Sequence, residues 1–509
     1  MLVDAATADR AAFARPFDVC IAGAGPAGIT LARSLAARGY DVALMEAGEI
    51  DYSDASQAFY VGDLTGLPEY PCEESRIRAF GGTSGHWEGK CRAFEDDDFA
   101  ARPWMPSSGW PIGRADLDPY AAEASAIVDL ESPVDLPDVP MRQEDARFRH
   151  VRWRMSPPTR FGDKFRDEIT DSGRITLGVR ASLVDLRLAD GLESVSTAVF
   201  RAWGGLEPSF EVTARAFVLC LGGLENARAL LSFDSQLPAG IGNQNDLVGR
   251  YFCDRPAVAT ANLLLAQPAE DEAQYFTPTA TFSAQNQLAR CAVTIEPRRV
   301  APITNEVKLL ARTAGCLTPE VAHLVARLRG GKSPCVFGGL AEFGIHQDPE
   351  NHPVAVVGVS MEQQLNRDSR VRLCERRDSF GMRRVLLDWQ LTDGDYHTMR
   401  AVTLAFGAHV AEQGIGRLKL RDWIAEDAPS LPAIGTGNGM IAGRQHMCTT
   451  RMSVDARAGV VDPDCKVHGM TNLYISGSSV FPTPGLPKPT LTIVQLALRL
   501  GDHLSTQLS

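Results

Sequence analysis

Three glycines near the N-terminus are spaced for binding a phosphate group. Gly23, Gly25 and Gly28 lie in the run GAGPAG. In such a run the first glycine permits a tight turn, the second lets the backbone approach a pyrophosphate, and the third lets a helix pack on the preceding strand. Glu46 lies eighteen residues beyond Gly28, where a carboxylate accepts hydrogen bonds from ribose hydroxyls. The spacing therefore predicts a dinucleotide site, without distinguishing FAD from NAD.

A strand–helix–strand unit must position this turn. Residues 17–22 (FDVCIA) form a short apolar run typical of a buried strand. A helical pattern follows over 29–38 and is closed by Gly39, and residues 41–45 predict a second strand that ends at Glu46. In this βαβ order the helix N-terminus presents free N–H groups and its positive dipole end to the phosphates.

Two further segments favour FAD over NAD. Residues 78–89 form a glycine-rich loop that carries aromatic side chains, and residues 472–482 predict a short strand that enters a turn. An apolar helix is then predicted from Pro489-Thr490 to about Leu504. A nicotinamide enzyme does not need its distant C-terminus to complete the cofactor site, whereas a flavoenzyme with FAD extended through its core does.

Taken together, these stretches resemble the glucose-methanol-choline (GMC) oxidoreductases, in particular the branch of pyranose oxidase and fructose dehydrogenase. The matching stretches follow the family order along nearly the whole chain. They are GAGPAG at 23–28 with Glu46, GGTSGHW at 81–87, SGWPIGRADLDPY at 108–120, SPPTRFG at 156–162, GGLENAR at 222–228, GNQNDLVGRYF at 242–252, CTTRM at 448–452 and VHGMTNLYISGSSVFPT at 467–483.

The resemblance implies an α/β fold with a Rossmann-like FAD-binding domain of the glutathione-reductase type. This domain would be discontinuous, built from 1–100, 170–256 and 445–509, while an α+β substrate-binding domain with an antiparallel sheet would take 101–169 and 257–444. Residues 354–359 and 383–389 read as strands and 319–329 as a helix. The residues implied in FAD binding are Gly23, Gly25, Gly28, Glu46, Gly81, Gly82, Thr83, His86, Trp87, Val184, Gly222, Gly477, Ser478 and Thr490.

Both catalytic positions of the family are atypical in this chain. The family base is a histidine six residues before the arginine of the T-T-R-M run, and counting back from Arg451 gives Gln445. The partner histidine or asparagine, which precedes the Pro-Thr of the last helix, is replaced by Lys488. A glutamine amide donates and accepts hydrogen bonds but takes no proton at neutral pH. Gln445 can therefore orient a substrate without being its base.

Two residues remain candidates for the base. His446 has a suitable ordinary pKa, but in an extended segment it points away from the face of Gln445 unless the loop bends; otherwise it is a packing residue. Lys488, if desolvated, can act as a neutral amine. It can also stabilise an anionic reduced flavin or bind a substrate carboxylate, or it can be an exposed lysine in a proline-rich loop.

Three other residues carry alternative interpretations. His86 is in register with the histidine that is covalently joined to the flavin in pyranose oxidase and choline oxidase, although a supporting aromatic contact is the favoured role. Cys448 is expected to be a small buried residue rather than a reactive thiol. His468 is expected to be structural.

Composition excludes several classes of protein. The chain has 509 residues, 44% of them hydrophobic, and a formal charge of −12. That charge argues against a nucleic-acid partner. No apolar run approaches the roughly 18–20 residues of a membrane span, and no signal-peptide pattern is seen. The eleven cysteines show no CxxC pair or metal-ligand spacing, so we expect reduced thiols, no bound metal and a cytoplasmic location.

The expected function is oxidation of a CH–OH group of a sugar, polyol or sugar-like metabolite, with hydride transfer to flavin N5. The electron acceptor would be oxygen or a quinone-like carrier. The alternative is a member of the same fold repurposed in secondary metabolism for non-alcohol chemistry, which Gln445 and Lys488 favour. A third class is a flavin-binding protein without turnover. Fold alone does not decide among them.

Overall fold

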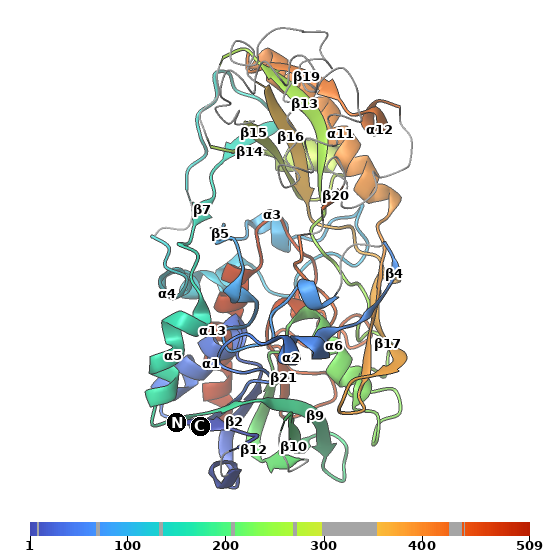
Figure 1. The fold of residues 1–509 in the computed structure, drawn as a ribbon. Coiled ribbons are helices and arrows are strands. Elements are labelled where there is room, and N and C mark those ends of the chain that lie inside the picture. Colours follow the sequence, from blue (N-terminus) through green and yellow to red (C-terminus); the bar gives the residue numbers. More distant parts are fainter. Residues whose placement is uncertain are drawn as a thin grey trace, which may run out of the picture.

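The computed structural model describes residues 1–7, 10–67, 72–131, 136–204, 209–267, 272–297, 354–426, 440–441 and 443–509. The protein has two halves, each built on its own large sheet (Figure 1). Both termini lie in the half that carries the parallel sheet. We call the two parts the parallel half and the antiparallel half.

The parallel half is centred on six strands in the order β1-β8-β3-β2-β12-β21, and all their pairings are parallel. Strands β3, β8 and β21 are buried along their whole length, as is usual in a parallel sheet, whereas the edge strand β1 begins with the exposed Leu2. Helices α1, α5 and α13 pack together, and α4 packs on α13. The bounds are β1 Leu2–Asp4, β2 Phe17–Ala22, β3 Val42–Met45, β8 Ile175–Val179, β12 Ala214–Leu219, β21 Leu473–Ile475, α1 Pro26–Ala37, α4 Ala121–Ile127, α5 Phe161–Asp171 and α13 Thr490–Leu508.

The predicted strand–helix–strand unit is confirmed. The first strand has the predicted bounds, and the second begins one residue later, at Val42. Helix α1 begins at Pro26 rather than at residue 29 because Pro26 occupies its first turn, where a missing N–H costs nothing. At the C-terminus α13 continues past Leu504 to Leu508. The helix predicted over 319–329 lies outside the described residues.

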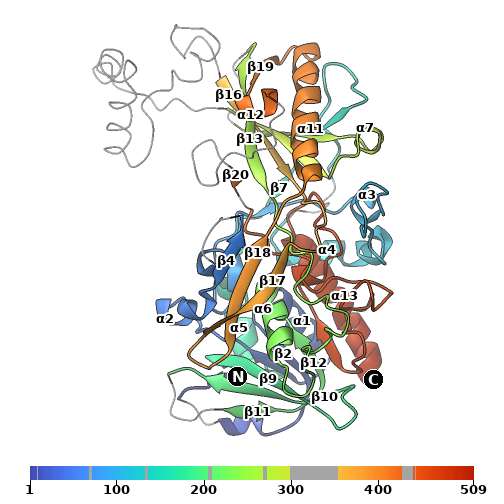
Figure 2. The same ribbon diagram turned by 90° about the vertical axis from the view of Figure 1, so that its right-hand side faces the viewer.

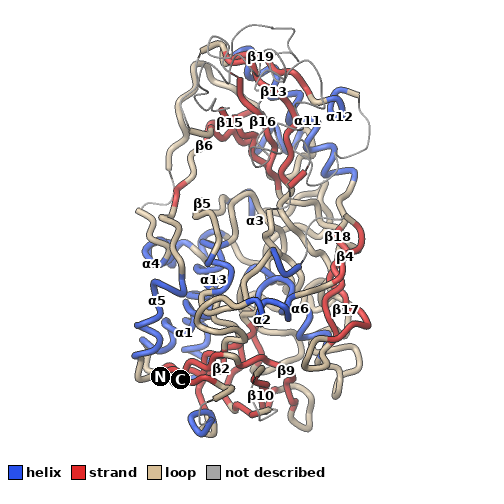
Figure 3. Tube along the Cα trace, in the orientation of Figure 1, coloured by secondary structure: helices blue, strands red, loops and turns tan. Residues whose placement is uncertain are grey.

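The antiparallel half is built on the strand order β19-β13-β16-β15-β14-β6, with β20 also paired to β13. Figure 3 labels β19, β13, β16, β15 and β6 in this half. Every pairing in it is antiparallel. Helix α11 packs on β13, β15 and β19. The bounds are β6 Phe148–Val151, β13 Ala257–Leu265, β14 Gln274–Pro278, β15 Cys291–Pro297, β16 Val354–Met361, β19 Gly416–Leu420, β20 Met440–Ile441 and α11 Asp393–Glu412.

Two three-stranded sheets and a short pair complete the described strands, in the orders β11-β10-β9, β17-β18-β4 and β5-β7. The hairpin β17–β18 lies beside α6 in the parallel half, although residues 257–444 were predicted to belong to the second domain (Figure 2). The remaining bounds are β4 Asp63–Gly66, β5 Lys90–Cys91, β7 Arg154–Met155, β9 Ala181–Leu188, β10 Val195–Ala202, β11 Phe210–Val212, β17 Arg370–Arg377, β18 Arg383–Trp389, α2 Asp54–Gln57, α3 Asp96–Phe99, α6 Gly222–Ser232, α7 Ala280–Gln285 and α12 Asp422–Ala425.

The described residues bear on two predictions from composition, which concern the cysteines and membrane-spanning helices. Nine cysteines lie among them, all free, and eight of these are buried. Within the described part of the chain, no helix combines the length and apolar character that crossing a bilayer requires.

Candidate active site

A cavity of about 1130 Å³ lies between the two halves, because residues of both halves line it. The parallel half contributes the glycine turn before α1 and the starts of α6 and α13. The antiparallel half contributes side chains from β13, β14, β15 and β16, among them Tyr275, Thr294 and Ser360. The cavity therefore joins a phosphate-binding turn to the face of a second sheet.

Three helix N-termini meet at this cavity without side-chain caps. Gly25 precedes α1, Leu221 precedes α6 and Pro489 precedes α13; all three line the cavity, and none caps its helix through a side-chain hydrogen bond. The first N–H groups of a helix have no partner within the helix. Their positive dipole ends consequently favour a ligand with phosphate or other anionic groups here.

The glycines leave space on the cavity side and close contacts on the other. A Cβ on Gly25 would have only the Cα of Gly82 within 4 Å, at 3.9 Å, and one on Gly222 or Gly477 would meet nothing. By contrast, a Cβ on Gly28 would lie 1.9 Å from the carbonyl oxygen of Gly23. Gly25 therefore has an open backbone beside the cavity, and Gly28 is closely packed against the turn that follows β2.

Other polar groups at the cavity suit an FAD molecule. Glu46 is 6% exposed, and its carboxylate accepts hydrogen bonds from the Ala24 N–H at 2.9 Å and the Gly48 N–H at 2.7 Å. The carboxylate is thereby fixed at the end of β3, the position expected to bind a ribose. Ser476 Oγ is buried on the cavity wall and has no hydrogen-bond partner among the described residues. Together with the open glycines, these groups fit a dinucleotide.

Gln445 is held in one orientation at the cavity. Its backbone N–H donates to Asp254 Oδ1 at 2.8 Å, and its side-chain Oε1 accepts a hydrogen bond from Arg255 Nε at 3.1 Å. Because an arginine only donates, the amide oxygen must face Arg255. The NH₂ group of Gln445 is left as a hydrogen-bond donor, so this side chain supplies a donor where the family supplies a base.

Lys488 lines the same cavity directly before α13. Its ammonium makes no hydrogen bond or ion pair with any residue that the structure describes. Burial, and then the charge of Arg255, lower the pKa of Lys488 to about 8, although Glu88 and Asp254 act in the opposite direction. A substantial fraction of this amine is therefore neutral in mildly alkaline solution.

His446 also lines the cavity, because the backbone around it is bent. Arg444 and Cys448 have φ of 55° and 71°, so the segment is not a regular extended strand and both Gln445 and His446 reach the cavity. The histidine is 8% exposed, and burial lowers its pKa to about 4, with the charges of Arg76 and Arg444 acting in the same direction. Its imidazole is therefore neutral, and a weak base, at physiological pH.

The structure brings most of the other predicted FAD residues to this cavity. Trp87 is anchored there by a hydrogen bond from its Nε1 to the carbonyl of Thr159 at 2.8 Å. Gly28 and Gly81 do not line the cavity; a Cβ on Gly81 would lie 2.4 Å from the backbone nitrogen of Gly162, so it packs the loop against α5. The predicted residues that line it are Gly23, Gly25, Glu46, Gly82, Thr83, His86, Trp87, Gly222, Gly477, Ser478 and Thr490.

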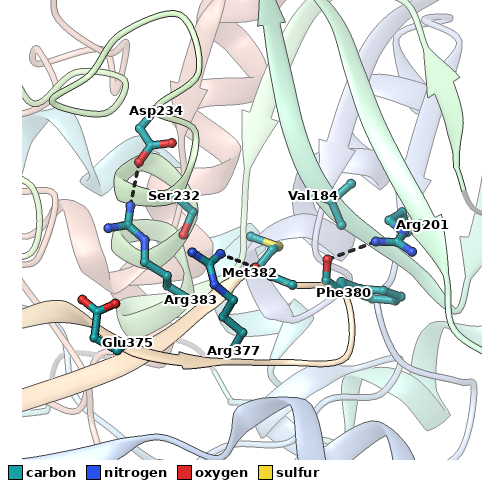
Figure 4. A pocket seen from close by; sticks show the side chains of 10 residues that line it. Val184, Arg201, Ser232, Asp234, Glu375, Arg377, Phe380, Met382 and Arg383 are labelled. Atoms are coloured by element: carbon teal, nitrogen blue, oxygen red, sulfur yellow. Dashed lines mark hydrogen bonds and ion pairs between the residues drawn. The ribbon is translucent and has the colours of Figure 1, made fainter.

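Val184 is placed elsewhere. It lies on β9 and lines a separate cavity of about 510 Å³ between that strand and the hairpin β17–β18. There Arg383 pairs with Asp234 at 2.7 Å, and Arg201 donates to the carbonyl of Phe380 at 3.0 Å (Figure 4). The side chain of Val184 is therefore not brought together with the other predicted cofactor residues.

The surroundings of Cys448 and His468 agree with the packing and structural roles expected for them. Cys448 is fully buried with a positive φ, as expected for a small packed residue. His468 is partly buried, and its Nε2 lies 3.0 Å from the carbonyl oxygen of Ser453, a contact typical of a structural histidine.

Asp254 and Arg255 contact the candidate site although the sequence did not point to them. Both are buried, with 0% and 1% exposure, and both contact the segment that carries Gln445. A signal was present, since these two charges interrupt an otherwise apolar stretch that runs from Tyr251 into β13. Charged residues inside a buried stretch are rarely there without a partner.

Comparisons with known proteins agree with this arrangement. Residues 366–497 match the family model described as GMC oxidoreductase. The chain is 23% identical to 2-methyl-1,2-propanediol dehydrogenase of Mycolicibacterium austroafricanum, over 97% of this chain and 96% of that protein. It is 25% identical to 6'''-hydroxyparomomycin C oxidase of Streptomyces lividus, over 58% of this chain and only 46% of that protein.

Solved structures share the fold. Pyridoxine 4-oxidase from "Mesorbium loti" superposes with a TM-score of 0.56 at 16% identity, covering 96% of this chain and 99% of that one. A formate oxidase gives 0.55 at 15% identity, covering 96% and 98%. The predicted resemblance to the GMC oxidoreductases is thus confirmed, and with it an oxidoreductase as the class of protein and FAD as its cofactor.

Proposed function

We propose that the protein oxidises a CH–OH group of a sugar, polyol or sugar-like metabolite, with Lys488 as the base. The observation that carries this proposal is that one cavity holds the NH₂ donor of Gln445 and the amine of Lys488, which has no hydrogen-bond or ion-pair partner among the described residues. Two relatives support the substrate class, one named for a diol and one for a paromomycin.

Each residue has a distinct part in this reaction. The NH₂ group of Gln445 donates a hydrogen bond to the substrate oxygen, and the neutral amine of Lys488 accepts the hydroxyl proton. The wall formed by β13 to β16 limits the access of water. When bound, FAD supplies the acceptor for the carbon-bound hydrogen, which leaves as hydride. Holding the alcohol in a near-attack geometry supplies several kcal/mol of the barrier reduction.

Lys488 is a better base than His446 in this setting. A proton acceptor works best when its pKa lies close to the operating pH. The pKa of Lys488 is lowered to about 8, whereas that of His446 is lowered to about 4. His446 is also tied to the loop, because its carbonyl accepts a hydrogen bond from Ser478 Oγ at 2.6 Å.

The test is anaerobic, stopped-flow reduction of the flavin by a panel of diols, sugars, polyols and aminoglycosides. With Lys488 as base, the rate constant for reduction rises with pH to a plateau above about pH 8, because only the neutral amine accepts a proton. Lys488→Met is expected to lower this rate constant by about a hundredfold or more and to remove its rise near pH 8.

Lys466→Met is the control, because Lys466 does not line this cavity and is paired with Asp462 at 3.9 Å. It is expected to keep the pH profile. His446→Ala is the competing variant: a profile that is flat from pH 6 to 9, together with loss of flavin reduction in His446→Ala alone, would assign the base to His446.

A second candidate is favoured by the same two residues. Gln445 and Lys488 replace the family pair, which suits a repurposed enzyme of secondary metabolism with non-alcohol chemistry. If dithionite reduces the flavin and no hydroxyl compound does, this candidate takes precedence.

We further propose that 1–100, 170–256 and 445–509 form the FAD-binding domain, and that oxygen or a quinone-like carrier accepts the electrons. Reoxidation rates with each acceptor test the latter.

A further inference from the structure

We propose that Asp254 and Arg255 are positioning residues that set both the orientation of Gln445 and the charge state of Lys488. The proposal rests on the proposed function only in giving Lys488 a chemical role. The two residues lie just before β13 and are buried beneath the two loops that carry Gln445 and Lys488.

Arg255 bridges the two loops through its guanidinium group. Its Nη2 donates to the carbonyl of Gly485 at 2.7 Å and to that of Pro487 at 2.6 Å, and its Nη1 donates to the carbonyl of Leu486. Its Nε donates to Gln445 Oε1 at 3.1 Å. One planar side chain thereby fixes three successive carbonyls before Lys488 and the amide of Gln445. A lysine cannot reproduce this geometry, because it lacks the rigid fork of donors.

The Asp254 carboxylate holds the loop that carries Gln445 by accepting hydrogen bonds from backbone N–H groups of that loop. Its Oδ1 accepts hydrogen bonds from the N–H groups of Gln445 at 2.8 Å and Arg255 at 2.6 Å, and its Oδ2 accepts one from the N–H of Arg444 at 3.1 Å. These bonds fix the bend that turns Gln445 and His446 toward the cavity. The carboxylate makes them in a fully buried position, where such charge-assisted bonds are strong.

The two residues also act on Lys488 with opposite signs. Lys488 lines the cavity together with Arg255, Glu88 and Lys90, and the charge of Asp254 also acts on it. Arg255 and Lys90 favour the neutral amine, whereas Asp254 and Glu88 favour the ammonium. Arg255 lies under the loop that carries Lys488, so removing its charge is expected to restore the ammonium form. Removing the charge of Asp254 is expected to do the reverse.

The experiment measures the titration of Lys488 directly in the holoenzyme, by trace acetylation at a series of pH values followed by mass spectrometry of the peptides. Arg255→Met is expected to move the midpoint for Lys488 up by about one pH unit, and Asp254→Asn is expected to move it down. Lys466, which is paired with Asp462 at 3.9 Å on the surface, is the internal control and keeps its midpoint.

Arg255→Lys keeps the positive charge at this site but removes the forked N–H donors, so it distinguishes the effect of the charge from that of the hydrogen bonds. It is expected to leave the midpoint of Lys488 nearly unchanged, while flavin reduction slows at every pH because Gln445 and the 485–487 carbonyls lose the fork. Flavin content and melting temperature identify any variant that has lost its fold, and Asp254→Asn, close in shape to the wild type, provides a second test if Arg255→Met does not fold.

Opposite shifts in Arg255→Met and Asp254→Asn support the proposal, whereas shifts of the same sign, or none, overturn it. Because acetylation needs no turnover, the result is independent of the proposed function. Opposite shifts together with an active Lys488→Met enzyme would keep the positioning pair and reject Lys488 as the base.

Discussion

At the scale of single residues, Glu46 shows how one carboxylate connects the fold to the cofactor. Its two oxygens each accept one backbone N–H, from Ala24 within the glycine turn and from Gly48 after β3. The acid thereby ties the phosphate-binding turn to the neighbouring strand while it lines the cavity. We expect its loss to weaken FAD binding as well as the fold, because the carboxylate both holds the glycine turn and lines the cavity.

Glu46→Gln tests this expectation. A glutamine has one acceptor oxygen, so one of the two N–H groups faces an NH₂ group instead, at a cost of about 1–3 kcal/mol. The dissociation constant for FAD is expected to rise about tenfold, which corresponds to 1.4 kcal/mol. Titration of apoprotein with FAD, followed by flavin fluorescence, measures it. Glu49→Gln is the control, since Glu49 is close in sequence but does not line the cavity; an equal loss of affinity in both variants would contradict the assignment.

Residues also differ in how well the sequence predicts them. The strand–turn–helix unit that carries Gly23, Gly25 and Gly28 could be predicted because it depends on neighbours a few residues away, while the roles of these glycines toward a cofactor stay predictions. Arg255 was missed because its partners are at 445 and 485–487, some two hundred residues further along the chain, and no local pattern encodes such a contact. The bend that brings His446 to the cavity also depends on a distant residue, because the Asp254 carboxylate holds the neighbouring N–H of Gln445.

At the scale of elements, the first βαβ unit contains two glycines with different surroundings, Gly25 and Gly28. Gly25 faces open space and Gly28 faces the carbonyl of Gly23. Gly25→Ala is expected to keep the melting temperature of the apoprotein and to lower FAD affinity, because the added methyl group occupies space left for the ligand. Gly28→Ala is expected to destabilise the protein by about 1–3 kcal/mol through overpacking between α1 and β2.

Gly173→Ala is the matched control for this pair, because a Cβ there meets nothing within 4 Å and Gly173 does not line the cavity. Thermal unfolding of the apoproteins and FAD titrations measure the two effects separately. If Gly25→Ala lowers the melting temperature as much as Gly28→Ala does, the space beside Gly25 is needed for folding rather than for the ligand.

At the scale of the whole molecule, buried charges join the two halves beneath the active-site loop. Arg290, just before β15, pairs with Glu95 at 2.9 Å, directly before α3, and with Asp98 at 3.2 Å, within α3. Asp98 in turn accepts the N–H of Leu486 at 2.9 Å, and Glu362, just after β16, accepts that of Gly485 at 3.2 Å. The loop before Lys488 is therefore held by carboxylates on one side and by Arg255 on the other.

Arg290→Met is expected to destabilise the protein by about 3–5 kcal/mol, because it removes the ion pair of the buried Asp98 carboxylate and leaves that charge only its bonds to backbone N–H groups. Urea unfolding measures this cost, with Arg457→Met as control, since Arg457 is 83% exposed and pairs only at the surface. Burial raises the pKa of Glu95, but Arg290, Arg92 and Arg149 outweigh it and lower that pKa to about 2. Glu95 therefore stabilises the fold above about pH 4.5, and this contribution is lost as pH falls toward 2. The variant should lose less stability than the wild type over that range, and an equal loss in both would show that Arg290 is not the group that keeps Glu95 ionised.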